Sequence, residues 1–397
     1  MLHKGSTLWS FALAILVAAP LMQQPNTLPA YDVDPFWPKP LPNNWILGAV
    51  AGVAVDSRDH VWITHRPGTL QPNETRSIWR AAPPVLEFDA DGTLLSSWGG
   101  PGGGGAGGSY EWPQLEHGIH VDHRDRVWLG SGGDKDSQIL AFTREGKFLL
   151  QIGRQGQGRG SNDTDNLGAP AHMIVDRDAN ELYVADGYVN HRVIVFDAET
   201  GKYKRHWGAY GKRPDDDWFK QSGETLPGPF RGVVQNENKP SQYDPKAPPA
   251  PQFRIVHAVR ISHDGLVYVC DRTNNRIQVF RKDGTFVQEV VIARETFGSG
   301  SVWDIGFTPD PDQTFLIVPD GTNQRVYLVE RRTLRLAGEF GRAGHWAGQF
   351  YGAHNLAVNA KGDLFITETY EGKRVQKFLY KGLGPAASPV ADSPPAR

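Results

Sequence analysis

Three histidines, His117, His257 and His354, stand at one position of an internal repeat. Each lies five residues before the polar residue that begins the first turn of its repeat unit. Three neutral imidazoles that converge and leave a fourth position open form the ligand set of a catalytic zinc ion, which acts as a Lewis acid or activates a bound oxygen. These residues therefore predict a zinc centre, if the fold brings them together.

The elements that must position the histidines are six similar units. The units begin "GVAVDSRDHVWITHR", "HGIHVDHRDRVWLGS", "HMIVDRDANELYVAD", "HAVRISHDGLVYVCD", "VWDIGFTPDPDQTFLIVPD" and "HNLAVNAKGDLFITE". A short alternating strand, a turn and a second strand recur in each, and two more strands usually follow. The pattern predicts an all-β fold, a six-bladed β-propeller with four antiparallel strands per blade, over residues 46–382. A solenoid is less favoured because the units lack a helix.

The repeat also predicts how the three histidines meet. The innermost strands of a propeller line its central channel, and equivalent positions in alternate blades of six lie about a third of a turn apart. Histidine occupies the register position in the second, fourth and sixth units. The other three units hold Ala51, Ala171 and either Val302 or Trp303 there. The histidines are thus expected to converge at the channel mouth with trigonal geometry.

Two nearby histidines fall outside this register. His172 is one residue out of register, and His120 lies three residues past His117. Because strand side chains alternate between faces, both are expected to point away from the metal site.

Propeller topology predicts which loops overlook the metal. The loops that join the second and third strands lie on its side of the ring, and they contain "THRPG", "ADGYVNHR" and "CDRTNNR". Arg66 and Tyr188 are therefore placed to reach a ligand on the metal. The alternatives are a surface charge for Arg66 and a blade-capping role for Tyr188.

The composition and charge of the chain limit the classes of molecule that it is expected to bind. The 397 residues are 39% hydrophobic and 22% charged, which suits a large folded core. A net charge of -2 gives no electrostatic reason to expect nucleic acid or an acidic membrane. Small molecules and peptides remain open as ligands, and a monomer is expected. Cys270, the single cysteine, lies mid-strand and is expected to be buried.

The ends of the chain differ from the repeat. Lys4 precedes an apolar run, so residues 1–24 are predicted to be a signal peptide and the protein to be secreted or periplasmic, with an uncleaved anchor as the alternative. Residues 25–45 are expected to close the ring with an outer strand near 37–46. A Pro-rich insertion spans about 209–251, and residues 383–397 form a tail expected to be disordered.

Several stretches resemble the catalytic core of the peptidyl-α-hydroxyglycine α-amidating lyase family, within the NHL-repeat propellers. They are "VAGVAVDSRDHVWITHR", "HGIHVD", "YVADGYVNHRVIVF", "VYVCDRTNNRIQVF" and "AHNLAV". The resemblance spans about residues 46–380. It implies that the three histidines selected by register bind a catalytic zinc ion, that Tyr188 is the active-site tyrosine and that Arg66 is the active-site arginine.

The resemblance also implies a calcium ion in the channel. Its ligands would be the backbone carbonyls of Val53 and Ile119 and the residue after the last zinc histidine. That residue is Asn355, where the family has an aspartate. An amide oxygen can ligate calcium, but the lost negative charge weakens the site.

The activity implied is cleavage of a carbinolamide, at the α-hydroxyglycine-like end of a peptide or small-molecule substrate, into an amide and glyoxylate. Two other functions remain open. One is a non-catalytic NHL propeller that binds a protein or glycan, since fold does not fix function. The other is a different metal-dependent propeller enzyme, such as a lactonase.

Overall fold

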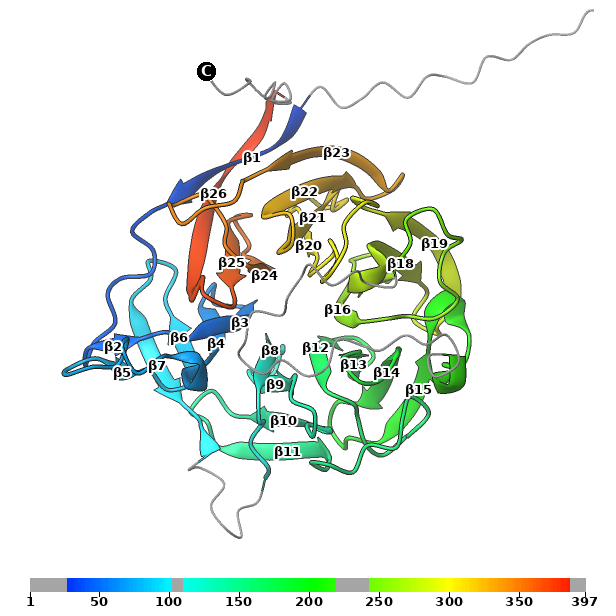
Figure 1. Cartoon of the computed structure of the whole chain (residues 1–397), viewed down its shortest axis with the longest axis horizontal. Coiled ribbons are helices and arrows are strands. Elements are labelled where there is room, and N and C mark those ends of the chain that lie inside the picture. Colours follow the sequence, from blue (N-terminus) through cyan, green and yellow to red (C-terminus); the bar gives the residue numbers. More distant parts are fainter. Residues whose placement is uncertain (1–26, 102–109, 219–242, 386–397) are drawn as a thin grey trace, which may run out of the picture.

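A computed structural model describes residues 27–101, 110–218 and 243–385. Within these residues, six four-stranded antiparallel sheets stand around a central axis (Figure 1). The predicted all-β, six-bladed propeller is confirmed. No helix in the described part of the chain is long and apolar enough to cross a membrane.

Each of the first three blades is continuous in sequence. Blade 1 contains β3 (Ala49–Val55), β4 (Val61–Arg66), β6 (Val85–Phe88) and β7 (Leu94–Trp98). Blade 2 contains β8 (Glu116–Val121), β9 (Val127–Ser131), β10 (Gln138–Phe142) and β11 (Phe148–Gly153). Blade 3 contains β12 (Pro170–Asp176), β13 (Glu181–Asp186), β14 (Arg192–Asp197) and β15 (Tyr203–Trp207).

The remaining blades complete the ring. Blade 4 contains β16 (Val256–Ile261), β17 (Val267–Asp271), β18 (Arg276–Phe280) and β19 (Phe286–Val291). Blade 5 contains β20 (Gly306–Phe307), β21 (Phe315–Asp320), β22 (Arg325–Glu330) and β23 (Arg335–Phe340). Blade 6 contains β24 (Ala353–Val358), β25 (Leu364–Glu368), β26 (Arg374–Pro385) and β1 (Thr27–Asp34).

The apolar core lies between neighbouring blades. Tyr268 and Cys270 of blade 4, for example, pack with Leu316 and Val318 of blade 5. Cys270 is buried, as predicted. The inner strands approach closely near the axis: a Cβ atom added to Gly52 of β3 would stand 2.5 Å from the carbonyl oxygen of His117. Glycine is therefore required there for blades 1 and 2 to meet.

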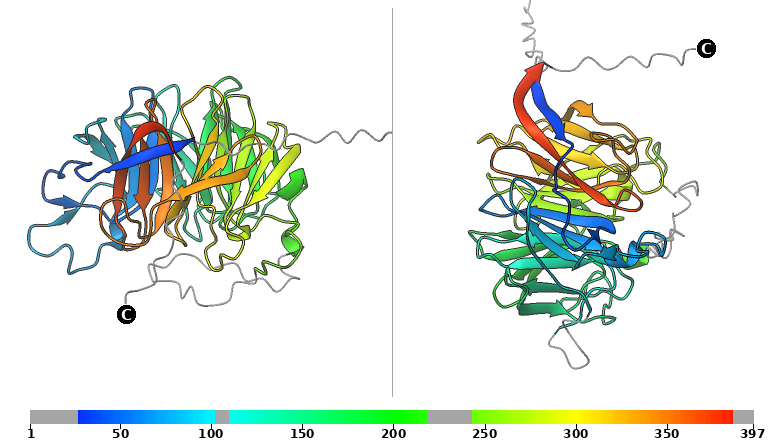
Figure 2. Two further views of the ribbon diagram at one scale, coloured as in Figure 1. Left: turned by 90° about the horizontal axis from the view of Figure 1, so that it is seen from above. Right: turned by 90° about the vertical axis from the view of Figure 1, so that its left-hand side faces the viewer.

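The N-terminal segment supplies the outer strand of blade 6, but not through the residues predicted. Strand β1 pairs antiparallel with β26, as Figure 2 shows, whereas an outer strand had been expected near 37–46. That placement was wrong because "PKPLP" at 38–42 contains three prolines, which cannot donate to a strand ladder. Trp37 instead packs its ring between Phe88 of blade 1 and Phe365 of blade 6.

A small addition lies outside the blades. Strand β2 (Trp45–Ile46) pairs in parallel with β5 (Arg80–Ala81), beside blade 1. The last strand, β26, runs to Pro385, three residues beyond the predicted end of the propeller. The predicted signal peptide, part of the 209–251 insertion and most of the predicted tail lie outside the described residues.

Candidate metal and catalytic centre

The fold brings His117, His257 and His354 to one point on the axis. They lie on β8, β16 and β24, the innermost strands of alternate blades (Figure 1). One ring nitrogen of each lies within 4.8 Å of the others, and the ring centroids are 4.8 to 5.0 Å apart. All three side chains are buried. The prediction from the repeat register that the three histidines lie together is therefore confirmed.

The three blades that carry no histidine at the register position hold these imidazoles in place. The Nδ1 atoms of His117, His257 and His354 make hydrogen bonds of 2.7, 2.5 and 2.8 Å to carbonyl oxygens of the next blade. Those carbonyls belong to Ala171, Trp303 and Ala51. They are the register positions that lack histidine, and in the fifth unit the position is Trp303 rather than Val302. Nδ1 donates the proton, so each Nε2 keeps its lone pair.

The electrostatics favour neutral imidazoles. Burial holds the pKa of His117 and His257 well below the usual range, and neighbouring charges lower it further: His354 and Arg66 for His117, Arg272 for His257. Burial, with Arg66 and Arg272, lowers the pKa of His354 to about 3. A neutral imidazole with a carbonyl on Nδ1 is the form that binds zinc through Nε2. The donor set therefore fits a zinc ion.

Tyr188 lies directly over this centre. It stands between β13 and β14, and its hydroxyl oxygen is 2.8 Å from Nε2 of His117 and 2.9 Å from Nε2 of His257. Burial raises the pKa of the phenol, while Arg272 and Arg66 lower it. The phenol is thus within reach of any ligand bound at the fourth position.

Arg66 also reaches the centre. It ends β4, is buried, and its Nε donates to the carbonyl oxygen of Glu116 at 2.8 Å. Its Nη1 lies 3.5 Å from Oγ1 of Thr369. Burial lowers the pKa of Arg66, and the electrostatic interaction with Tyr188 is the largest that opposes this shift. Arg66 and Tyr188 therefore act on each other across the site.

A second arginine, Arg272, was not singled out from the sequence. It begins the short helix η4 (Arg272–Asn274) after β17, and its Nη1 lies 3.4 Å from the hydroxyl of Tyr188. Its guanidinium stands over the Trp303 ring at 4.4 Å, and its buried Nε has no hydrogen-bond partner among the described residues. The signal was present: Arg272 comes directly after the second strand of its unit, β17, much as Arg66 ends the second strand of blade 1, β4.

A second level of polar side chains, formed by Arg260, Asp304 and Asn355, lies next to the histidines along the axis. Nη2 of Arg260 donates to Oδ2 of Asp304 at 2.8 Å and to the carbonyl oxygen of Leu356 at 2.7 Å. Nδ2 of Asn355 donates to the same carboxylate oxygen at 2.9 Å. His172 and His120 are buried near this level and outside the three-histidine group. Arg260 and Asp304 neutralise each other there.

This level does not fit the calcium ion implied by the resemblance. Val53 and Ile119 lie on β3 and β8, and Oδ1 of Asn355 is buried without a partner among the described residues, which would suit one ligand. The neighbouring carboxylate, Asp304, is however already paired with a guanidinium. A calcium ion would meet that fixed positive charge with no free anionic oxygen.

A second group of potential ligands, Asp56, His60 and Glu87, is filled by an arginine. Nη1 of Arg144 donates to Asp56 at 2.6 Å, and its Nη2 donates to Glu87. These contacts link blades 1 and 2. The group is therefore an ion-pair cluster rather than a metal site.

Comparison with known proteins finds an NHL repeat and relatives with lyase and NHL names. The NHL repeat model matches residues 253–280, which contain the inner three strands of blade 4. Peptidyl-alpha-hydroxyglycine alpha-amidating lyase 1 of Drosophila melanogaster is 26% identical over 377 residues, 87% of this chain and 59% of that protein. The chain thus spans about three fifths of that relative. NHL repeat-containing protein 3 of Mus musculus is 26% identical, over 88% of this chain and 84% of its own.

A solved structure adds the fold alone. A streptogramin B lyase superposes with a TM-score of 0.50 at 12% identity, over 88% of this chain and 98% of that chain. Fold and site together define a six-bladed β-propeller with three histidines converging at its axis, in which one unit matches the NHL repeat model. Its resemblance to peptidyl-α-hydroxyglycine α-amidating lyases, predicted from the motifs, is confirmed by the relatives that carry this name.

Proposed function

We propose that the protein is a zinc-dependent lyase that cleaves the carbinolamide of a peptidyl-α-hydroxyglycine into an amide and glyoxylate. The observation that carries the proposal is the group formed by three buried histidines, each with Nδ1 engaged, and the Tyr188 hydroxyl against two of their Nε2 atoms. The names of the relatives support the same reaction class.

The reaction moves one proton and breaks one bond. In R-CO-NH-CH(OH)-COO⁻ the hydroxyl loses its proton, the C–O bond becomes a carbonyl, the C–N bond breaks and the departing nitrogen gains a proton. A bound zinc ion supplies Lewis acidity that lowers the pKa of the hydroxyl. Tyr188 accepts the hydroxyl proton as a phenolate and returns it to the nitrogen.

The two arginines take different parts. Arg272, whose Nη1 faces the Tyr188 hydroxyl, stabilises the phenolate and so lowers the pKa of the tyrosine. Arg66, held by the Glu116 carbonyl at its Nε, binds the substrate carboxylate with the rest of its guanidinium. Neutral histidines and two cations suit a substrate that carries a negative charge.

A second candidate is a non-catalytic NHL propeller that binds a protein or glycan. The similarity to NHL repeat-containing protein 3 over most of both chains favours it. A lactonase-type metal site is less supported, because the three-histidine group contains no carboxylate. We further propose that the substrate is a peptide or a small molecule, that the protein is a monomer and that it is exported. Export is proposed from the sequence of residues 1–24.

The test is glyoxylate release by the zinc-loaded protein from an N-acyl-α-hydroxyglycine. Glyoxylate and amide are expected in equal amounts. His354→Ala should abolish both products, while His263→Ala, an exposed histidine in a turn of blade 4, should release them at the wild-type rate. No glyoxylate from a protein that holds zinc would favour the binding propeller instead.

A further inference from the structure

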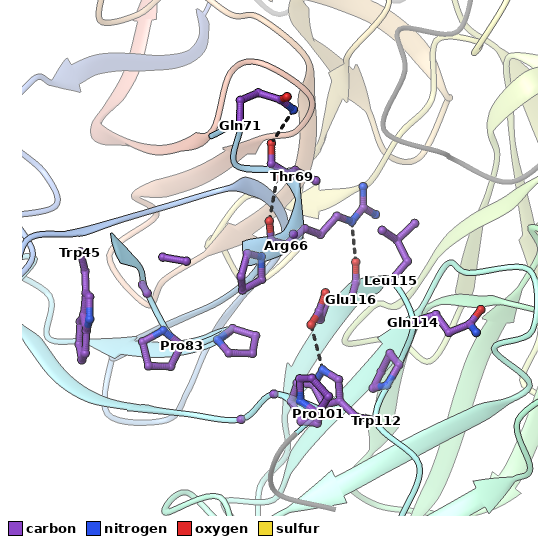
Figure 3. Close-up of a pocket in the computed structure, with 18 residues that line it drawn as sticks. Trp45, Arg66, Thr69, Gln71, Pro83, Pro101, Trp112, Gln114, Leu115 and Glu116 are labelled. Atoms are coloured by element: carbon purple, nitrogen blue, oxygen red, sulfur yellow. Dashed lines mark hydrogen bonds between the residues drawn. The ribbon is translucent and has the colours of Figure 1, made fainter. Parts of the chain in front are cut away.

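A cleft of about 700 Å³ lies between blades 1 and 2 beside Arg66 (Figure 3). Its walls are mostly rings and other apolar groups, among them Trp45, Pro83, Pro84, Trp112, Pro113 and Leu115. Arg66 and Glu116 are the charged residues that line it. The size suits a ligand of one or two amino-acid residues.

One end of the cleft adjoins the three-histidine centre. Arg66 lines the cleft, and its Nε donates to the carbonyl oxygen of Glu116, the residue directly before His117. Leu115 also lines the cleft, and it meets His117 and Tyr188 around Gly132. A Cβ atom placed on Gly132 would lie 3.2 Å from His117, 3.6 Å from Leu115 and 3.7 Å from Tyr188. Arg66 and Leu115 therefore border both the cleft and the centre.

The two charged side chains of the cleft, Arg66 and Glu116, are held in place by hydrogen bonds. Nε1 of Trp112 donates to Oε1 of Glu116 at 2.9 Å, and Arg66 donates to the carbonyl oxygen of the same residue (Figure 3). These bonds and the prolines fix the wall before a ligand arrives, which lowers the entropic cost of binding. The free part of the Arg66 guanidinium is assigned above to the carboxylate of the hydroxyglycine, so a second anionic group in the cleft would lose its hydration beside Glu116 without a cation of its own.

We propose that this cleft binds the residue that precedes the hydroxyglycine of the substrate and selects an apolar, ring-bearing side chain there, such as phenylalanine or proline. The proposal rests on the lyase function above and adds its substrate preference. Flat apolar walls gain contact area with a ring and exclude water from it.

The test compares two substrates of equal length, N-acetyl-phenylalanyl-α-hydroxyglycine and N-acetyl-aspartyl-α-hydroxyglycine. For the zinc-loaded wild type, kcat/KM should favour the phenylalanyl substrate by about tenfold or more. Trp45→Ala, which removes one wall, should reduce that ratio several-fold. The matched control is Trp346→Ala, which removes an exposed tryptophan outside the cleft and should leave the ratio unchanged.

A second variant guards against misfolding of the first. Gly68 lines the cleft, and a Cβ atom added there meets nothing within 4 Å, so Gly68→Phe should fold and fill the space. It should also reduce the preference. Equal kcat/KM for both substrates, or a ratio unmoved by either variant, would overturn the inference alone. Absence of glyoxylate from both substrates would overturn the proposed function, and this inference with it.

Discussion

Two levels of polar residues lie along the propeller axis, and they differ in what they leave unsatisfied. At the histidine level, each Nδ1 is bound to a carbonyl of the next blade and each Nε2 faces the centre. At the neighbouring level, Arg260 and Asp304 satisfy each other and the nearby carbonyls. The first level leaves nitrogen lone pairs directed at one point, and the second joins neighbouring blades.

The same strands contribute to both levels. Strand β16 carries His257 and Arg260, and β24 carries His354 and Asn355. Three buried lone pairs that converge lack hydrogen bonds to match them all, which is costly unless a metal takes them up. The ion pair needs no such ligand. Function and stability are therefore separable by substitution within single strands.

The largest effect is expected at the histidine level. Tyr188→Phe should lower kcat for glyoxylate release by about 10²- to 10⁴-fold, because the proton carrier is lost. Zinc content should stay at the wild-type value, since the three histidines keep their carbonyl partners. Elemental analysis beside the kinetic assay checks both points, and normal turnover in this variant would remove the tyrosine from the mechanism.

The neighbouring level should show the opposite pattern. Arg260→Met should lower the free energy of unfolding by about 3 to 5 kcal/mol, because Asp304 is left buried and uncompensated. Urea unfolding measures this. Arg260→Met with Asp304→Asn removes the stranded charge, so it should be less destabilised than the single variant. A single variant as stable as wild type would show that the pair does not support the fold.

A smaller effect comes from pH. Burial, then Arg260, lowers the pKa of His172 to about 3, against 6.5 for an ordinary histidine. The unfolded chain therefore binds the proton first, and stability present above pH 6.5 is lost as pH falls toward 3. Between pH 6.5 and 5.0 this residue should account for about 1 to 2 kcal/mol of the loss in the free energy of unfolding. Urea unfolding across this range should show a shallower decline in His172→Leu, and an equal slope would contradict the assignment.

The sequence predicted the fold and the convergence of the histidines because both follow from the repeat. Equal spacing in alternate units is enough to place His117, His257 and His354 together. Arg272 was missed although it lies in "CDRTNNR", a loop predicted to overlook the metal, because the sequence does not show which residue of that loop reaches Tyr188. The Arg260 and Asp304 pair was missed because blade 5 has a short inner strand, β20, and Asp304 precedes it.

Strand placement at the N-terminus failed for a local reason. The prolines at 38–42 exclude a strand there, and the alternating stretch upstream, Thr27–Asp34, pairs with β26 instead. The apolar cleft beside Arg66 could not be predicted, because its walls come from strands and loops that are far apart in the sequence.

The central claim is that the three histidines bind zinc, and metal content tests it most directly. The purified wild-type protein, His257→Ala and His263→Ala are each exposed to zinc, dialysed and measured by elemental analysis. Wild type and His263→Ala should hold about one zinc ion per chain, and His257→Ala should hold almost none. Zinc retained fully by His257→Ala, or absent from the wild type after exposure, would contradict the account.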